Sequence, residues 1–154
     1  MKSIIVYGSR HHGNTKKLVT YLAEKHEIKI VDAETDLKVD LNDYDLIGFA
    51  SGIDFGRFYD PVMDLAGTLH EGKFVYALYT CAKDNGRYGK QIEELSREKG
   101  FKYLGEYGCR GYNTYGPWKL IGGMNKNHPS EDEMERAEKF YEKIEKEVYK
   151  DIDK

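Results

Sequence analysis

The segment from Gly8 to Thr15, Gly-Ser-Arg-His-His-Gly-Asn-Thr, combines the residue types that hold a phosphate group without a metal ion. It follows a short apolar run and opens a segment with helical spacing, so a helix would present unpaired backbone N–H groups and partial positive charge there. Ser9, Asn14 and Thr15 add short side-chain donors. Gly13 would let a phosphate approach the backbone closely. The alternative is that Asn14 or Thr15 only caps the helix.

The same eight residues nearly match the loop that binds nucleoside triphosphates, G-x-x-x-x-G-K-[ST]. Gly8, Gly13 and Thr15 stand at their positions in that pattern. Asn14 stands where the lysine belongs, so nothing is placed to reach β- or γ-phosphates. The dinucleotide pattern G-x-G-x-x-G is absent as well, which argues against a structurally bound NAD. A monophosphate suits the loop better than ATP or GTP.

Hydrophobic periodicity predicts strands that alternate with helices around this loop. The predicted strands cover residues 3–8, 28–31, 45–51, 74–80 and 102–109. The predicted helices cover residues 14–25, 61–69 and 88–99, and a last helix begins after a cap at Ser130, with Glu133 completing a capping box. No repeat, low-complexity tract or linker interrupts the pattern, so we expect one domain over residues 1–154.

The predicted strands differ in hydrophobicity, and this difference predicts their order in the sheet. Those that begin at Ser3, Asp45 and Phe74 are nearly continuous apolar runs, as expected where helices cover both faces. Those near Ile28 and Lys102 are interrupted by charges, which sheet edges tolerate. The predicted fold class is therefore α/β, a doubly wound five-stranded parallel sheet in the order 2-1-3-4-5. Ligands of such sheets bind at the C-terminal ends of the strands, which selects the loops after strands 1, 3, 4 and 5.

On this topology, the residues from Ser9 to Thr15 resemble the phosphate loop of the flavodoxin family, whose commonest form is S/T-x-T-G-N-T. The resemblance implies a flavodoxin-like fold and non-covalently bound flavin mononucleotide (FMN). This loop is one residue longer, and His12 stands where a threonine usually precedes Gly-Asn-Thr. His12 or Arg10 could replace the lost hydroxyl, and their positive charge would favour a phosphate dianion. The element order matches nearly the whole chain, but the segment 33–42 is too short for much of the family's second helix.

The loop after the third predicted strand has residues suited to a flavin ring, which needs a flat apolar slot with backbone groups along its polar edge. Phe55, Phe58 and Tyr59 could line that slot. In flavodoxins a glycine-containing peptide of this loop reorients when the flavin N5 gains a proton. The candidates here are Ser51–Gly52 and Phe55–Gly56. The alternative is a glycine-rich loop whose aromatic side chains cover the core.

The loop over residues 80–88 resembles the family's loop beside the pyrimidine edge of the flavin, where backbone N–H groups after Thr80 could donate to the ring. Cys81 and Cys109 are predicted to be packing residues, because no basic partner is fixed beside either thiol. The predicted cofactor-binding residues are Ser9, Arg10, His11, His12, Gly13, Asn14, Thr15, Ser51, Gly52, Ile53, Phe55, Gly56, Thr80, Cys81, Ala82 and Tyr88.

The stretch from Arg110 to Pro129 is longer than a simple connection between a strand and a helix, and loops of this length usually have a function. It is rich in glycine and contains Tyr112, Tyr115 and Trp118. Two interpretations stay open. The stretch either covers the flavin or offers a docking surface beside it, or else it covers the fifth strand.

Composition argues against several classes of protein. The net charge of −3 argues against a nucleic-acid binder, and no apolar stretch approaches the roughly 18 residues of a membrane span. The N-terminus lacks the features of a signal peptide. Two cysteines are too few for a disulfide framework, which favours a cytoplasmic location. Adjacent His11 and His12 side chains diverge and have no third ligand at a suitable spacing, so no metal site is predicted.

The predicted function is that of an FMN-binding electron-transfer protein that serves redox partner proteins, without catalytic residues of its own. Many flavodoxins are strongly acidic, whereas this chain is close to neutral, so its partner is expected to differ. The alternative is an FMN-dependent oxidoreductase that reduces a quinone or porphyrinogen-like substrate. A receiver domain of the same topology would need acidic residues where Gly8–Ser9 and Ser51–Gly52 stand. The oligomeric state stays open.

Overall fold

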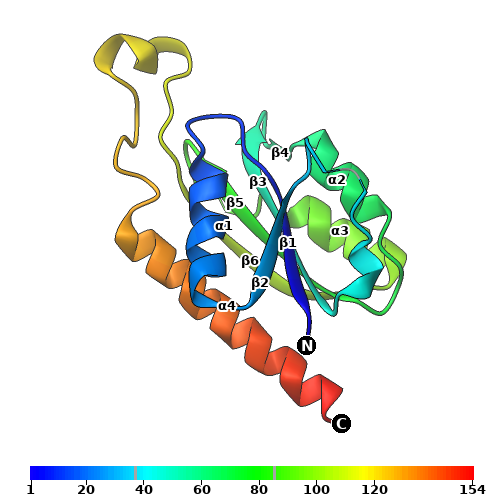
Figure 1. Ribbon diagram of the computed structural model, residues 1–154. Coiled ribbons are helices and arrows are strands. Elements are labelled where there is room, and N and C mark those ends of the chain that lie inside the picture. The colour runs from blue at the N-terminus through cyan, green and yellow to red at the C-terminus, as the bar shows by residue number, and fades with distance from the viewer. Residues whose placement is uncertain (37, 85) are drawn as a thin grey trace.

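A parallel β-sheet forms the centre of the fold, and helices cover both of its faces (Figure 1). The computed structural model describes residues 1–36, 38–84 and 86–154; Leu37, in the short segment 33–42, and Asn85, in the loop 80–88, lie outside the described residues. The strands are β1 (Ser3–Gly8), β2 (Ile28–Asp32), β3 (Leu46–Asp54), β4 (Arg57–Phe58), β5 (Phe74–Cys81) and β6 (Lys102–Arg110). The helices are α1 (Asn14–Lys25), α2 (Asp60–Gly67), α3 (Lys90–Lys99), α4 (Glu131–Ile152) and the short 3-10 helices η1 (Leu41–Asp43) and η2 (Gly116–Ile121).

The five parallel strands follow the predicted doubly wound order, which reads β2-β1-β3-β5-β6 because of one further strand. That strand, β4, pairs antiparallel with the end of β3 through Ile53↔Phe58 and Asp54↔Arg57. It arises because β3 runs to Asp54, beyond the predicted end at Ser51. Phe55 and Gly56 then form a two-residue turn in which both φ angles are positive, +51° and +75°. The predicted five-stranded sheet is thus correct in its parallel part and lacks this short hairpin.

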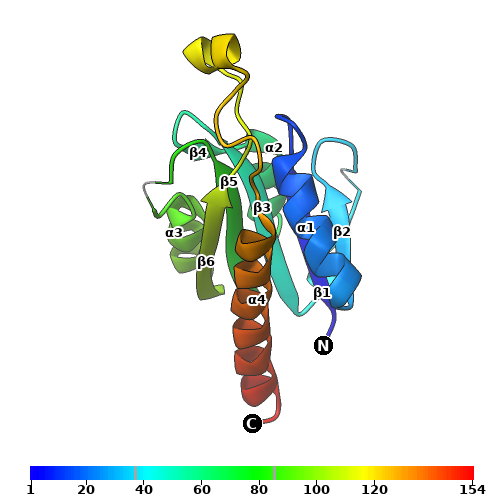
Figure 2. The same ribbon diagram turned by 90° about the vertical axis from the view of Figure 1, so that its left-hand side faces the viewer.

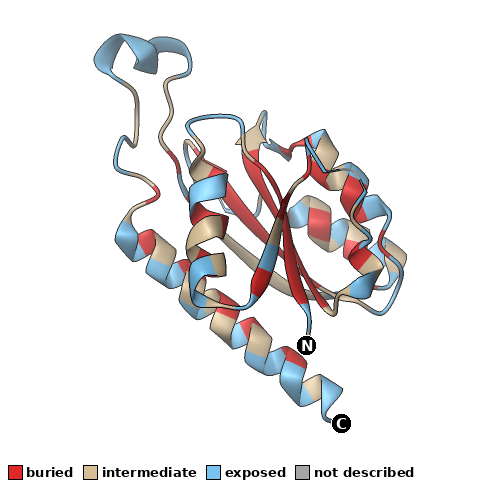
Figure 3. Cartoon of the chain, in the orientation of Figure 1, coloured by how far each residue is buried: buried red, intermediate tan, exposed pale blue. Residues whose placement is uncertain are grey.

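Two apolar layers, one on each face of the sheet, explain why the central strands are almost purely hydrophobic (Figure 3). All six residues of β1 are buried. Ile4 and Val6 face the layer covered by α2 and α3, whereas Ile5 faces the layer under α1 and α4. At the edges, β2 and β6 carry the exposed lysines Lys29 and Lys102, as expected for strands with only one neighbour.

The helix boundaries follow the local signals in the sequence. Helix α1 begins at Asn14 as predicted, and α3 ends at Gly100, whose φ of +76° is the left-handed conformation that glycine favours. The capping box of α4 is present, with Ser130 Oγ accepting from Glu133 N and Glu133 Oε2 accepting from Ser130 N. Helix α2 starts at Asp60, with Pro61 in its first turn.

Replacing Tyr76 by phenylalanine is expected to raise the free energy of unfolding by about 1 kcal/mol. The ring lies over Gly48, and its buried hydroxyl has no hydrogen-bond partner among the described residues. Burial also raises the pKa of Tyr76 well above its ordinary value, so the hydroxyl stays neutral. The matched control is Tyr141→Phe, which should lower stability because Tyr141 OH donates to Ser3 Oγ at 3.1 Å. Urea unfolding of both variants measures the difference, and a less stable Tyr76→Phe variant would contradict this account.

Candidate functional site

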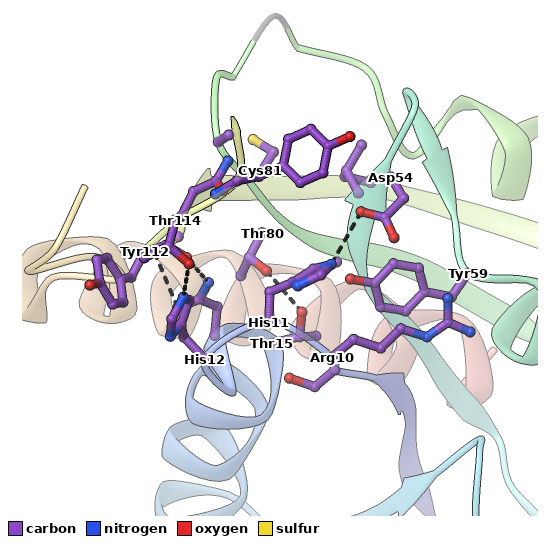
Figure 4. A pocket seen from close by; sticks show the side chains of 18 of the residues that line it. Arg10, His11, His12, Thr15, Asp54, Tyr59, Thr80, Cys81, Tyr112 and Thr114 are labelled. Carbon is purple, nitrogen blue, oxygen red and sulfur yellow. Dashed lines mark hydrogen bonds and ion pairs between the residues drawn. The ribbon is translucent and has the colours of Figure 1, made fainter. Parts of the chain in front are cut away.

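A pocket of about 640 Å³ opens at the C-terminal ends of the strands, between the loops that follow β1, β3, β5 and β6 (Figure 4). This is the edge of the sheet that the topology selects for a ligand. The predicted residues that line the pocket are Ser9, Arg10, His11, His12, Asn14, Thr15, Gly52, Ile53, Phe55, Thr80, Cys81 and Ala82. Gly13, Ser51, Gly56 and Tyr88 are not among the lining residues.

The N-terminus of α1 faces this pocket with its backbone donors free. His12 and Gly13 both have left-handed φ angles, +54° and +65°, and the helix has no side-chain cap. The backbone N–H groups of His12, Gly13 and Thr15 donate to no acceptor among the described residues. Ser9 Oγ accepts from Lys16 N at 3.2 Å and so links the start of the loop to the first turn of α1. A helix terminus of this kind is suited to an anion.

Asn14 and Thr15 do not cap the helix, so the capping alternative is wrong. The Asn14 side chain binds the backbone of Tyr112, donating to its carbonyl oxygen at 2.8 Å and accepting from its N–H at 3.2 Å. Thr15 Oγ1 lies 2.8 Å from Thr80 Oγ1, and both residues are buried. These two residues therefore tie the first turn of α1 to the loops after β6 and β5.

The three basic side chains of the loop after β1 each contact a partner at the rim of the pocket (Figure 4). Arg10 Nε donates to Glu34 at 2.5 Å, and its guanidinium lies 4.3 Å from the centre of the Tyr59 ring. His11 Nε2 lies 3.5 Å from an oxygen of Asp54. His12 Nε2 lies 2.9 Å from Thr114 Oγ1, and the centre of its ring lies 4.1 Å from the centre of the Tyr112 ring, with the two planes tilted by 42°. The idea that Arg10 or His12 replaces the missing threonine hydroxyl stays a prediction that these contacts do not favour.

The aromatic residues after β3 divide between the pocket and the core. Phe55 is 97% exposed at the pocket, whereas Phe58 is buried in the core and does not line the pocket. Tyr59 is buried and lines one wall; burial and then the charge of Asp54 raise its pKa to about 12, so its hydroxyl is neutral. Gly52 is required beside it, because a Cβ there would lie 2.3 Å from the Tyr59 hydroxyl. Of the three aromatic residues predicted for the slot, Phe55 and Tyr59 therefore line the pocket.

Three of the predicted residues outside the lining have structural roles. Ser51 is fully buried; its Oγ accepts from Tyr59 N at 2.9 Å and donates to the carbonyl oxygen of Gly52 at 2.6 Å. Gly56 completes the tight turn between β3 and β4. The Tyr88 ring packs edge-on against Tyr79, with centroids 5.4 Å apart. These residues shape the loops that carry the lining residues.

The two cysteines are buried packing residues. Burial raises the pKa of Cys81 to about 12 and raises the pKa of Cys109 as well. The Cys81 thiol donates to the carbonyl oxygen of Cys109 at 3.5 Å. Protonated thiols of this kind are poor nucleophiles, in agreement with the packing role expected for them.

A projecting segment supplies one wall of the pocket, and it corresponds to the long stretch for which the sequence left two interpretations open. We call residues 111–129, which include η2, the arm; it extends beyond the ends of the strands instead of lying along β6 (Figures 1 and 2). The base of the arm is fixed by Asn14, by hydrogen bonds between the backbones of Asn113 and Met124, and by Asn125 Nδ2 donating to Ala82 O at 2.7 Å. Tyr59, which was expected to line the flavin slot, also lines the pocket. The lining residues that were not predicted to bind the cofactor are Asp54, Gly111, Tyr112, Asn113, Thr114, Tyr115, Gly116 and Lys119.

One cluster of potential metal ligands lies outside the pocket. His26, Glu138 and Glu142 have ligand atoms within 4.8 Å of one another. Glu138 already accepts from the Tyr21 hydroxyl at 3.1 Å and lies 3.5 Å from Lys25 Nζ. The cluster is therefore adequately explained as an ion-pair network between α1 and α4.

The fold and the site together define a class of protein. The fold is a doubly wound α/β domain with a free helix N-terminus at its switch point, and its loop after β1 lacks the lysine of the triphosphate loop. The family model described as a flavodoxin domain matches residues 4–79. A relative in Methanocaldococcus jannaschii, named only as an uncharacterised protein, is 36% identical over 147 residues, which cover 94% of this chain and 98% of that protein. The chain belongs to the flavodoxin family.

Solved structures agree with this fold. A flavodoxin from the domain Archaea superposes with a TM-score of 0.69 at 16% identity, covering 97% of this chain and 99% of that one. A flavoprotein of Lactobacillus acidophilus in complex with FMN has a TM-score of 0.55 at 16% identity and covers 71% of this chain and 93% of that one. Among the described residues, no helix has both the length and the hydrophobicity to cross a membrane.

Proposed function

We propose that this chain binds FMN in the pocket and transfers electrons to and from partner proteins. The observation that carries the proposal is the set of free backbone N–H groups of His12, Gly13 and Thr15 at the mouth of α1. They can hold a phosphate without a metal ion or a lysine. Membership of the flavodoxin family and the FMN complex of the similar Lactobacillus flavoprotein support the choice of cofactor.

The rest of the pocket fits a flavin ring. Phe55 and Tyr59 offer aromatic faces on one side, and the arm supplies Tyr112 and Tyr115 on the other. Bound FMN would supply the electron-accepting and electron-donating chemistry. The protein would hold the phosphate at α1, exclude water from the ring and adjust its electronics through backbone groups after β3 and β5. No catalytic acid, base or nucleophile is assigned.

Titration of the purified protein with FMN tests this proposal. The expected result is a shift of the flavin absorption bands and quenching of flavin fluorescence at micromolar FMN. An unchanged spectrum at these concentrations would contradict the proposal. The cytoplasmic location and the single domain over residues 1–154 stay predictions alongside it.

Replacing Thr15 by alanine is expected to weaken FMN binding by about 1–3 kcal/mol. The substitution leaves the buried Thr80 hydroxyl without its partner at 2.8 Å and loosens the turn that presents the phosphate donors. Thr15→Ser keeps the hydroxyl and is the matched control, which should bind FMN nearly as wild type does. Fluorescence titration gives both affinities, and equal affinity for Thr15→Ala would remove Thr15 from the account.

The extent of the pocket favours a second candidate function, an FMN-dependent oxidoreductase that reduces a quinone or porphyrinogen-like substrate. The pocket continues past the helix terminus to Tyr115 and Lys119 on the arm, which leaves room beside a flavin. This function predicts steady turnover of NAD(P)H and a quinone by the purified protein alone. Turnover that requires an added reductase would favour the electron carrier.

A further inference from the structure

The outer end of the arm exposes large apolar side chains. Leu120 is 89% exposed, Tyr115 75%, Ile121 72% and Trp118 41%. They lie on or beside the six-residue helix η2, which stands clear of the rest of the molecule in both views (Figures 1 and 2). Phe55, which is 97% exposed, lines the same pocket as Tyr115. Apolar side chains gathered in this way are typical of an interaction site.

Positive charge accompanies this apolar tip. The segments 9–17 and 110–129 contain six lysine or arginine residues and no acidic residue, in a chain whose net charge is −3. Arg10 is paired with Glu34. The other five basic residues of these segments form no ion pair with the described residues: Lys16, Lys17, Arg110, Lys119 and Lys126. The loop before α1 and the arm are therefore basic, although the chain as a whole is slightly acidic; the acidic groups in contact with the loop are Asp54, which lines the pocket, and Glu34, which pairs with Arg10.

We propose that the arm and the loop before α1 dock a partner protein whose contact surface is acidic around an apolar centre. The inference rests on the proposed electron transfer, because a partner seated there lies against the pocket mouth. Trp118 and Tyr115 are the residue types that contribute most to protein interfaces. The unpaired lysines would steer an acidic partner to the pocket.

Two other occupants fit the observations less well. Two copies that meet face to face would bring two basic surfaces together, and a head-to-tail contact between copies would build a ring or an open filament instead of a pair. A flat anionic membrane could touch η2 at the outer end of the arm, but Lys16 and Lys17 lie back on the body of the domain (Figure 1). A folded protein can contact the tip and the body at once.

Cytochrome c in native and succinylated forms provides a matched pair of probes, because succinylation converts its lysines into carboxylates and keeps the haem. Stopped-flow mixing with the reduced, FMN-loaded protein gives the rate constant for haem reduction. We expect the succinylated form to react at least about tenfold faster at low ionic strength, and this advantage to disappear at high salt. Surface plasmon resonance of the FMN-free chain with the same probes measures docking separately, so failure of FMN binding and failure of docking are distinguishable.

Variants of the arm locate the contact. The double variant Leu120→Ser/Ile121→Ser and the variant Lys126→Glu should each slow the reaction with the succinylated probe several-fold. Lys146→Glu, the same charge change on the exposed side of α4, should leave it unchanged. Equal rates with both probes, or equal effects of Lys126→Glu and Lys146→Glu, would overturn the proposal. So would binding to phosphatidylserine vesicles without binding to the probe, or a dimer in solution that the tip variants dissociate.

Discussion

Replacing Ser9 by aspartate is expected to lower the affinity for FMN by about a hundredfold or more, which corresponds to about 3 kcal/mol. The new carboxylate would lie in the same turn as the free N–H groups and repel a phosphate dianion there. The fold should tolerate the change, because aspartate can also accept from Lys16 N and is favourable at a helix N-terminus. Fluorescence titration at constant ionic strength measures the affinity.

Riboflavin and a neutral variant provide the controls for this prediction. Riboflavin lacks the phosphate, so Ser9→Asp should change its affinity by no more than about twofold. Ser9→Asn keeps an acceptor for Lys16 N without the charge and should bind FMN more tightly than Ser9→Asp does. If Ser9→Asp weakened riboflavin and FMN equally, the loss would reflect damage to the pocket and not repulsion of a phosphate.

Replacing Glu133 by glutamine is expected to lower the free energy of unfolding by about 1.5–3 kcal/mol at neutral pH. Its buried carboxylate accepts from Ser130 N at 2.8 Å and Arg110 N at 3.4 Å, and lies 2.6 Å from His128 Nδ1. It therefore joins the end of β6, the end of the arm and the start of α4. The control is Glu131→Gln, the same substitution at an exposed position two residues earlier, which should lower the free energy of unfolding only slightly.

The contribution of Glu133 should depend on pH in a defined direction. Burial alone would raise the pKa of Glu133, but the hydrogen bonds from Ser130, His128 and Arg110 outweigh burial and hold it below the ordinary value. A lowered pKa in the folded state means that the stabilisation is complete above the ordinary glutamate pKa and is lost as the pH falls through the lowered one. Urea unfolding across this range should show the wild type and Glu133→Gln converging in acid. A constant difference would contradict this assignment.

Most of the sheet was predictable because its strands carry local signals. The buried run of β1 and the charged edge strand β2 indicate their positions directly. The short hairpin to β4 was not predictable, since Phe55 adopts a positive φ that non-glycine residues rarely take. The free N-terminus of α1 at the pocket was predictable because its donors belong to the backbone at the start of a helix.

The arm side of the pocket was predictable only as one of two interpretations of the stretch 110–129, since its position depends on contacts between residues distant in the chain. Asn14 was expected to donate to a phosphate, but its side chain fixes the backbone of Tyr112, 98 residues away. His12 likewise pairs with Thr114. Nothing in the local sequence of the arm specifies these partners. An asparagine and a histidine beside a helix start carry the same local signal whether they bind a ligand or a distant loop.

Backbone amide chemical shifts of the 15N-labelled protein, recorded with FMN and with riboflavin, test the central claim most directly. The two ligands differ only in the phosphate, so the difference between the spectra locates that group. We expect the largest differences at the N–H groups of His12, Gly13 and Thr15, which have no acceptor among the described residues. Unchanged shifts at these three amides, with the largest differences elsewhere in the chain, would contradict it.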